Sequence, residues 1–193
     1  MKLRILLTAM AVLLLAAPAL ADHHEKPGDH AGDMDMGPMG PPAEMKVMMG
    51  HVGDWDVTMK IRMAPDAPWM DCTGTSHVTS IFDGGVLHEK FESTMMGMPM
   101  TGFLILTYDR EDHQYETIWM DSISCRTSHM AGQMKDGVMT MAGTDKYQGQ
   151  DMWNRSTMTL KSADLLTFTM ESSMDGENWF ENMQMVYKRK SAK

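Results

Sequence analysis

The feature that most limits the possible folds is a series of short segments, from residue 55 onwards, in which apolar and polar residues alternate. In the first segment, apolar residues occupy every second position: Trp55, Val57, Met59, Ile61 and Met63. This period of two is typical of a strand with one buried face. Several later segments end at turn sequences, of which Lys135-Asp136-Gly137 is a hairpin signal.

The alternation predicts about ten strands. Their expected ranges are 55–63, 70–82, 86–95, 100–108, 114–121, 124–133, 138–147, 152–161, 165–173 and 179–190. Strands at this spacing, with short turns and no long helical pattern, favour an antiparallel up-and-down barrel or a sandwich. The chain has neither a glycine-rich phosphate loop nor alternating βα units, which excludes dinucleotide-binding folds. The predicted fold class is all-β.

A short helix is expected just before the first strand, over residues 43–52. Its apolar residues follow a helical spacing: Met45, Met48, Met49 and Val52. Two prolines precede it and Gly53 follows it, which sets its bounds. We expect this helix to cover one end of the barrel.

The first residues have the pattern of a secretory signal peptide. Lys2 and Arg4 precede an apolar run, and Ala19-Leu20-Ala21 matches a cleavage site. The expected organisation is therefore a signal peptide (1–21), a disordered tail rich in His, Met, Pro and Gly (22–44), and a β-barrel domain (45–190). The apolar run is short for a membrane span, so we expect a periplasmic or secreted protein.

The tail carries residue types that bind copper. After cleavage the chain would begin Asp22-His23-His24, and a free amine, two amides and the third-position imidazole can hold Cu(II) in a square plane. Imidazole and soft thioethers that suit Cu(I) follow at His30, Met34, Met36 and Met39. The alternative is a solvated tail in which these residues have no such role.

The net charge limits the classes of binding partner, and the cysteine content limits the possible redox chemistry. The net charge is −9, which argues against a nucleic-acid or anionic-membrane partner. The two cysteines, Cys72 and Cys125, would pair in an oxidising compartment or remain as buried thiols. The absence of a C-x-x-C motif argues against thioredoxin-like chemistry.

Gly53-Asp54-Trp55, with a basic residue near the end of the last strand, resembles the calycins, the lipocalin-like barrels. The resemblance implies that Arg189 packs over Trp55 and closes one end. The region 44–190 also resembles the bacterial domain of unknown function 1579. The matching motifs are Gly53-x-Trp55, Gly84-Gly85, Tyr108-Asp109, Trp119-x-Asp121 and Tyr187-x-Arg189. That family implies no activity.

A barrel of this kind suggests binding of a small apolar ligand. The candidate pocket residues are Phe91, Phe103, Trp119, Met120 and Asp121, and Glu89 could also place a polar group in the lumen. The 26 methionines would either line an adaptable apolar pocket or replace leucine in ordinary packing. Copper binding through the tail is the alternative function.

An enzyme acting on a lipid-like substrate is a third hypothesis, without residues to support it. The chain lacks G-x-S-x-G, and His88-Glu89 lacks the second histidine of a zinc-protease motif. Haem would need a strand histidine such as His77, His88 or His129. In the haem-binding barrels that this chain resembles, the ligand lies late in the barrel, and no histidine follows His129. Haem is therefore not expected.

Overall fold

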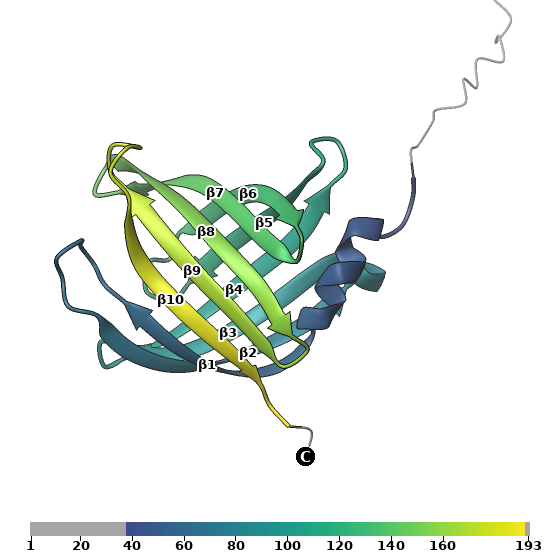
Figure 1. Ribbon diagram of the computed structural model, residues 1–193, viewed down its shortest axis with the longest axis horizontal. Coiled ribbons are helices and arrows are strands. Elements are labelled where there is room, and N and C mark those ends of the chain that lie inside the picture. Colours follow the sequence, from purple (N-terminus) through teal and green to yellow (C-terminus); the bar gives the residue numbers. More distant parts are fainter. Residues whose placement is uncertain (1–37, 192–193) are drawn as a thin grey trace, which may run out of the picture. The chain divides into compact units, whose positions relative to one another are not determined.

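The computed structural model describes residues 38–191, which form a closed antiparallel barrel of ten strands (Figure 1). The strands are β1 (Gly53–Ile61), β2 (Met70–Ile81), β3 (Val86–Met95), β4 (Met98–Asp109), β5 (Gln114–Asp121), β6 (Thr127–Lys135), β7 (Val138–Tyr147), β8 (Gln150–Ser162), β9 (Leu165–Ser173) and β10 (Phe180–Arg189). Each strand pairs with its neighbours in sequence, and β1 closes the ring against β10. The predicted all-β class and up-and-down barrel are therefore confirmed.

Three hairpins use two-residue turns in which both residues have positive φ. They are Met96-Gly97, Asp136-Gly137 and Gln148-Gly149, with φ between 50° and 84°. This backbone twist matches the twist of the paired strands, and glycine adopts it without a steric penalty. The local turn chemistry thus fixes the register of β3–β4, β6–β7 and β7–β8.

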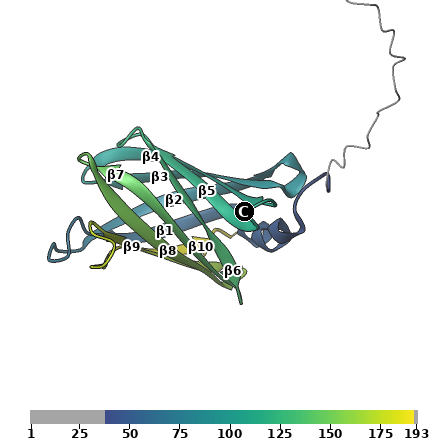
Figure 2. The same ribbon diagram turned by 90° about the horizontal axis from the view of Figure 1, so that it is seen from above.

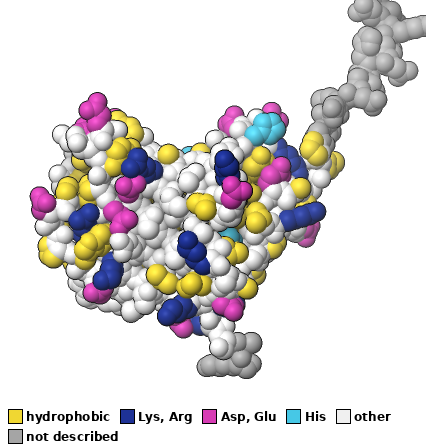
Figure 3. Space-filling view, viewed as in Figure 1, with side chains coloured by type: hydrophobic (Ala, Val, Ile, Leu, Met, Phe, Trp, Pro, Cys, Tyr) yellow, Lys and Arg dark blue, Asp and Glu magenta, His cyan; other side chains and the backbone are white. Residues whose placement is uncertain are grey.

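The interior is built from the alternate residues of each strand. In β1, Trp55, Val57 and Met59 are buried, whereas the residues between them are exposed. On the outer face of β8, β9 and β10, basic and acidic side chains lie beside one another (Figure 3). One such pair is Arg155 and Glu171, whose Nε and Oε2 atoms are 2.6 Å apart.

One barrel end is covered by η1 (Ala43–His51), which is a 3-10 helix (Figure 2). The expected helical spacing of 3.6 residues is therefore wrong here. Three residues per turn bring Met45, Met48 and His51 to the buried side, whereas Met49 is only partly buried. The Tyr115 hydroxyl donates to the Glu44 carbonyl over 2.9 Å, which ties the helix to β5.

The covered end is closed by contacts of η1 with the first and last strands of the barrel, β1 and β10. The Trp55 indole donates to the His51 carbonyl over 2.9 Å. The Arg189 guanidinium lies 4.1 Å from the Trp55 ring centre and donates to the carbonyls of Gly50 and Val52. Trp55 and Arg189 are also directly paired across β1 and β10. We refer to this end as the closed end and to the other as the open end.

Part of the segment expected to be a disordered tail lies against the barrel. Arg110 donates to the carbonyls of Pro38 and Gly40, and η1 begins at Ala43. The predicted signal peptide and tail residues 22–37 lie outside the described residues, and so do the copper-binding candidates Asp22, His23, His24, His30, Met34 and Met36. Met39 is described and is 84% exposed.

Both cysteines are free thiols in this structure, so the disulfide that the sequence suggested is not formed. Cys72 faces inward on β2 beside Met59, and Cys125 is exposed in the loop between β5 and β6. The two strands β3 and β4 separate these positions in the barrel. Over residues 38–191, the helices are all too short to cross a membrane.

Candidate functional site

The most unusual group in the barrel interior is the carboxyl of Glu89. It lies on β3 between Leu87 and Phe91, which share its face of the strand and are 4% and 1% exposed. Its direct neighbours across the sheet are apolar as well, Val78 on β2 and Leu104 on β4. A carboxyl group thus occupies a position that the strand pattern assigns to the core.

Two hydroxyl groups from other strands face this carboxyl. Ser76 lies on β2 and is 2% exposed, and Tyr187 reaches in from β10, with its ring edge against Trp55. Glu89 Oε1 and Ser76 Oγ are buried and have no hydrogen-bond partner within residues 38–191. We call Glu89, Ser76 and Tyr187 the carboxyl–hydroxyl cluster.

Burial sets the protonation state of the cluster. Desolvation raises the pKa of Glu89, and the nearby hydroxyls of Ser76 and Tyr187 offset only part of that rise. Burial also raises the pKa of Tyr187 well above its usual value, and the Glu89 carboxyl adds to this shift. Both groups are therefore driven towards their neutral, hydrogen-bond-donating forms.

An aromatic wall lies beside the cluster, towards the open end. Phe91 and Trp119 pack with their ring centres 6.2 Å apart. The Trp119 ring lies so close to Gly102 on β4 that a Cβ at that position would overlap it, and Phe91 covers Gly74 in the same way. Asp121 Oδ2 accepts a hydrogen bond from the Trp119 indole over 3.0 Å and so fixes its orientation. Its neighbouring turn amides and the indole lower the pKa of Asp121 against the effect of burial.

The structure brings together three of the five pocket residues expected from the sequence, Phe91, Trp119 and Asp121. The other two, Phe103 and Met120, are paired with each other on the outer face and are 37% and 41% exposed. Successive residues of a strand point to opposite faces, and the residues just before these two, Gly102 and Trp119, point inward. Phe103 and Met120 therefore point outward and do not line the interior.

The three strand histidines also occupy outward positions. Phe103 stacks on His88, with the ring centres 5.5 Å apart. His77 Nδ1 lies 2.6 Å from Asp54 Oδ1, and His129 Nε2 lies 3.6 Å from Glu116 Oε2. All three imidazoles are therefore away from the lumen.

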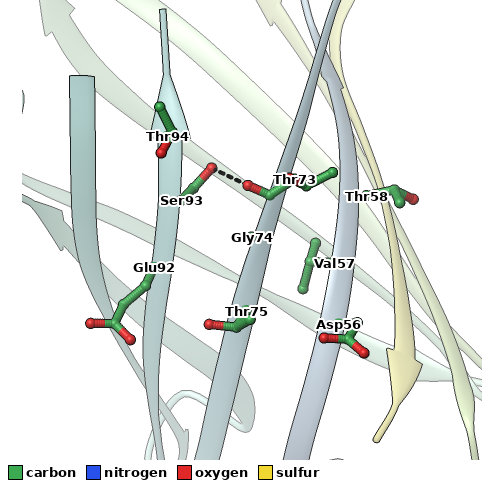
Figure 4. A pocket seen from close by; sticks show the side chains of 9 residues that line it. All are labelled: Asp56, Val57, Thr58, Thr73, Gly74, Thr75, Glu92, Ser93 and Thr94. Carbon is green, nitrogen blue, oxygen red and sulfur yellow. Dashed lines mark hydrogen bonds between the residues drawn. The ribbon is translucent and has the colours of Figure 1, made fainter. Parts of the chain in front are cut away.

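A shallow groove of about 530 Å³ lies on the outer face of β1, β2 and β3 (Figure 4). Its exposed lining consists of hydroxyls and two carboxylates, Thr58, Thr73, Thr75, Thr94, Asp56 and Glu92. Asp56 is ion-paired with Lys190 at 3.5 Å and Glu92 with Lys90 at 2.9 Å. A smaller hollow of about 100 Å³ lies between η1 and the neighbouring strands. The groove lies outside the lumen, whereas the smaller hollow is bordered by the inward residues Met134, Met158 and Leu160 at the covered end.

Three carboxylates could approach a cation at the exposed turn between β4 and β5. Ligand atoms of Asp109, Asp112 and Glu116 lie within 4.8 Å of one another. Asp109 already accepts the backbone amides of Glu111 and Asp112. Asp109 is thus explained by the turn that it stabilises, and Glu116 by its contacts with Gln114 and His129.

The closed ten-strand barrel with its Trp55–Arg189 closure defines a calycin-like protein. Residues 40–189 match the family described as "Protein of unknown function (DUF1579)", and the chain belongs to this family. No curated protein sequence matches the chain significantly.

Two solved structures show the same fold. Rv2717c from M. tuberculosis matches with a TM-score of 0.61 at 11% identity, over 78% of this chain and 99% of that chain. The S-type phycobiliprotein lyase CPES from Guillardia theta matches with a TM-score of 0.53 at 11% identity, over 75% and 91%. These identities establish likeness of fold alone.

Proposed function

We propose that the barrel binds a small amphipathic molecule in its lumen. The observation that carries this proposal is the carboxyl–hydroxyl cluster, which holds two buried polar atoms without partners among apolar neighbours on β2, β3 and β4. A ligand that accepts hydrogen bonds would satisfy them. A carbonyl oxygen suits the cluster, because neutral Glu89, Ser76 and Tyr187 can all donate.

Stability alone gives no reason to keep such a cluster. A buried polar atom without a partner costs about 1–3 kcal/mol, and an apolar side chain of similar shape would remove that cost. Proteins retain unfavourable groups of this kind mainly where they act on a ligand or substrate. We therefore interpret Glu89 as a binding residue rather than as a structural one.

The wall of the lumen beside the cluster suits an apolar body. Phe91 and Trp119 offer flat aromatic surface, and inward methionines on other strands, such as Met130 and Met141, can adjust to the shape of a ligand. The ligand would enter from the open end, because η1, Trp55 and Arg189 occupy the other one. On the basis of the signal-peptide pattern of residues 1–21, we propose that the protein acts after export.

The test uses a naphthyl methyl ketone, a neutral fluorescent probe with an apolar body and one carbonyl acceptor. Its affinity is measured by fluorescence titration for the wild type and for Glu89→Leu. We expect Glu89→Leu to bind the probe at least tenfold more weakly, which corresponds to loss of about 1.4 kcal/mol. The same variant should unfold at a higher urea concentration, because an unpaired polar group has been removed.

Glu92→Gln is the matched control, since Glu92 lies on the same strand and is exposed and ion-paired with Lys90. It should bind the probe as the wild type does. The proposal is wrong if the wild type does not bind the ketone, or if Glu89→Leu binds it equally well. Reduced stability of Glu89→Leu would instead assign Glu89 to the structural framework.

A further inference from the structure

The hollow at the covered end contains a histidine nitrogen that the fold does not use. His51 is the last residue of η1, is 6% exposed, and lines the hollow of about 100 Å³ between η1 and the barrel strands. Its Nε2 atom is buried and has no hydrogen-bond partner within residues 38–191. A buried polar atom of this kind calls for an explanation, such as a bound water or ion.

The other ring nitrogen fixes the state of the imidazole. His51 Nδ1 lies 3.0 Å from the Met48 carbonyl oxygen, which can only accept, so the proton is on Nδ1. Burial lowers the pKa of His51, and the charge of Arg189 adds to this against the effect of the Met48 hydrogen bond. The ring is therefore neutral near pH 7, with a lone pair on Nε2. A backbone carbonyl orients metal-binding histidines in the same way.

The strands bring soft thioether groups to the same hollow. Met134 on β6 and Met158 on β8 both line it. Each of them pairs across the sheet with Met139 on β7, so the three side chains point inward from neighbouring strands. Methionine side chains are flexible, and two of them on either side of a third can converge on one point. One imidazole and two thioethers thus border a single small space.

This space suits a metal ion better than a water molecule. An ordered buried water makes about three hydrogen bonds. Apart from His51, the side chains that line the hollow are apolar: Val47, Met134, Met158 and Leu160. A water would therefore have Nε2 as its one side-chain partner there, whereas a soft ion can also bind the thioethers. The hollow is close to the surface, because Val47 is 48% exposed.

We propose that His51, Met134 and Met158 form a binding site for a soft monovalent metal ion, Cu(I). Imidazole and thioether ligands suit Cu(I), and all three donors are neutral. None of the described acidic side chains lines the hollow, and the Arg189 guanidinium is bound to the carbonyl of the adjacent Gly50. A positive charge beside neutral donors favours an ion of charge +1 over a dication. The site is separate from the amino-terminal tail and independent of the ligand proposed for the lumen.

The experiment follows methionine methyl groups by NMR in the whole chain, tail included, with Ag(I) as the probe. Ag(I) has the charge and ligand preference of Cu(I) and is stable in air. The signals of Met134 and Met158 are those that disappear in Met134→Leu and Met158→Leu, which nearly conserve side-chain volume. Met95 is the matched control, because it packs against the core at the last position of β3, away from η1, and is assigned through Met95→Leu.

In the wild type, Ag(I) should shift the Met134 and Met158 signals along one binding curve and leave Met95 unchanged. In His51→Phe, half-saturation of these two signals should need at least tenfold more Ag(I). Met134→Leu should have the same effect on the Met158 signal, without any change to η1. Zn(II) should shift neither signal. Because each signal belongs to one residue, metal held by the tail is observed separately.

Three results would overturn the inference. The first is a wild type whose Met134 and Met158 signals do not respond to Ag(I). The second is a binding curve that stays the same in His51→Phe and in Met134→Leu. The third is a Met95 signal that shifts along the same curve, since Ag(I) would then bind methionines without selection. An equal response to Zn(II) would contradict a site for a soft monovalent ion.

Discussion

The guanidinium of Arg189 lies 4.1 Å from the ring centre of Trp55, and both side chains donate to carbonyls at the end of η1. Arg189 binds the carbonyls of Gly50 and Val52, and Trp55 binds that of His51. One cation thus joins the first strand, the last strand and the covering helix. In the proposed function, the ligand therefore enters from the opposite end.

Replacement of Arg189 should destabilise the whole barrel. We expect Arg189→Ala to lower the free energy of unfolding by about 2–4 kcal/mol, because it removes charge-assisted hydrogen bonds and a cation–π contact together. Arg155→Ala is the control, since Arg155 lies 4.2 Å from the Trp179 ring centre but on the exposed surface. Urea unfolding should show a clearly smaller change for Arg155→Ala. Equal effects of the two substitutions would contradict the role assigned to the closed end.

The aromatic wall depends on the absence of a side chain at Gly102. A Cβ there would overlap the Trp119 ring, so Gly102→Ala must displace the indole from Phe91 and Asp121. We expect the naphthyl ketone to bind several-fold more weakly, with a change in the tryptophan emission spectrum. Thr101→Ala alters the adjacent outer position and should leave both properties unchanged. Wild-type affinity in Gly102→Ala would show that the wall does not contact the ligand.

Glu89 should make the stability of the protein depend on pH. Its pKa is raised above the usual value of 4.5, so the folded state keeps a proton that the unfolded chain releases. The free energy of unfolding should therefore fall as the pH rises from about 4.5 through the raised pKa, by about 1.4 kcal/mol for each unit of elevation. In Glu89→Gln this part of the fall should be absent. Urea titrations between pH 4.5 and 8 measure it, and identical profiles for the two proteins would exclude the predicted shift.

Copper binding by the amino-terminal tail stays a prediction from the sequence. If cleavage follows Ala21, the processed protein should bind one Cu(II) through Asp22, His23 and His24. His24→Ala should lose this site, and so should a protein with one residue added before Asp22. Cu(II) titration followed by visible absorption measures it, with His88→Ala on β3 as the control. Unchanged binding in the first two variants would rule the site out.

The sequence predicted the barrel well because its turns and its alternating pattern are local. It did not distinguish the two faces of β4 and β5, where apolar residues occur on both sides. Phe103 belongs to a continuous apolar run, and the inward position beside it is Gly102, which has no side chain to mark the face. Met120 follows Trp119 on a strand with apolar residues on both faces. Periodicity therefore could not place these two residues.

Sequence periodicity also could not settle the type of the covering helix or find all of the interior polar groups. Met45 and Met48 fit a period of three as well as one of 3.6, and only the burial of His51 decides between them. Glu89 could be recognised as inward, because it lies between Leu87 and Phe91. The hydrogen-bonded row of interior polar side chains could not be recognised, because its members come from five strands and the last one lies at a bulge that only strand pairing reveals. The row consists of Ser128, Asp145, Asn154, Ser172 and Asn182.

Native mass spectrometry of the protein purified from its source is the most direct test of ligand binding in the lumen. We expect the wild type and Glu92→Gln to carry a small molecule that is released on denaturation, and Glu89→Leu to be free of it. A wild-type protein with the mass of its polypeptide alone, or a ligand retained equally by Glu89→Leu, would contradict the account.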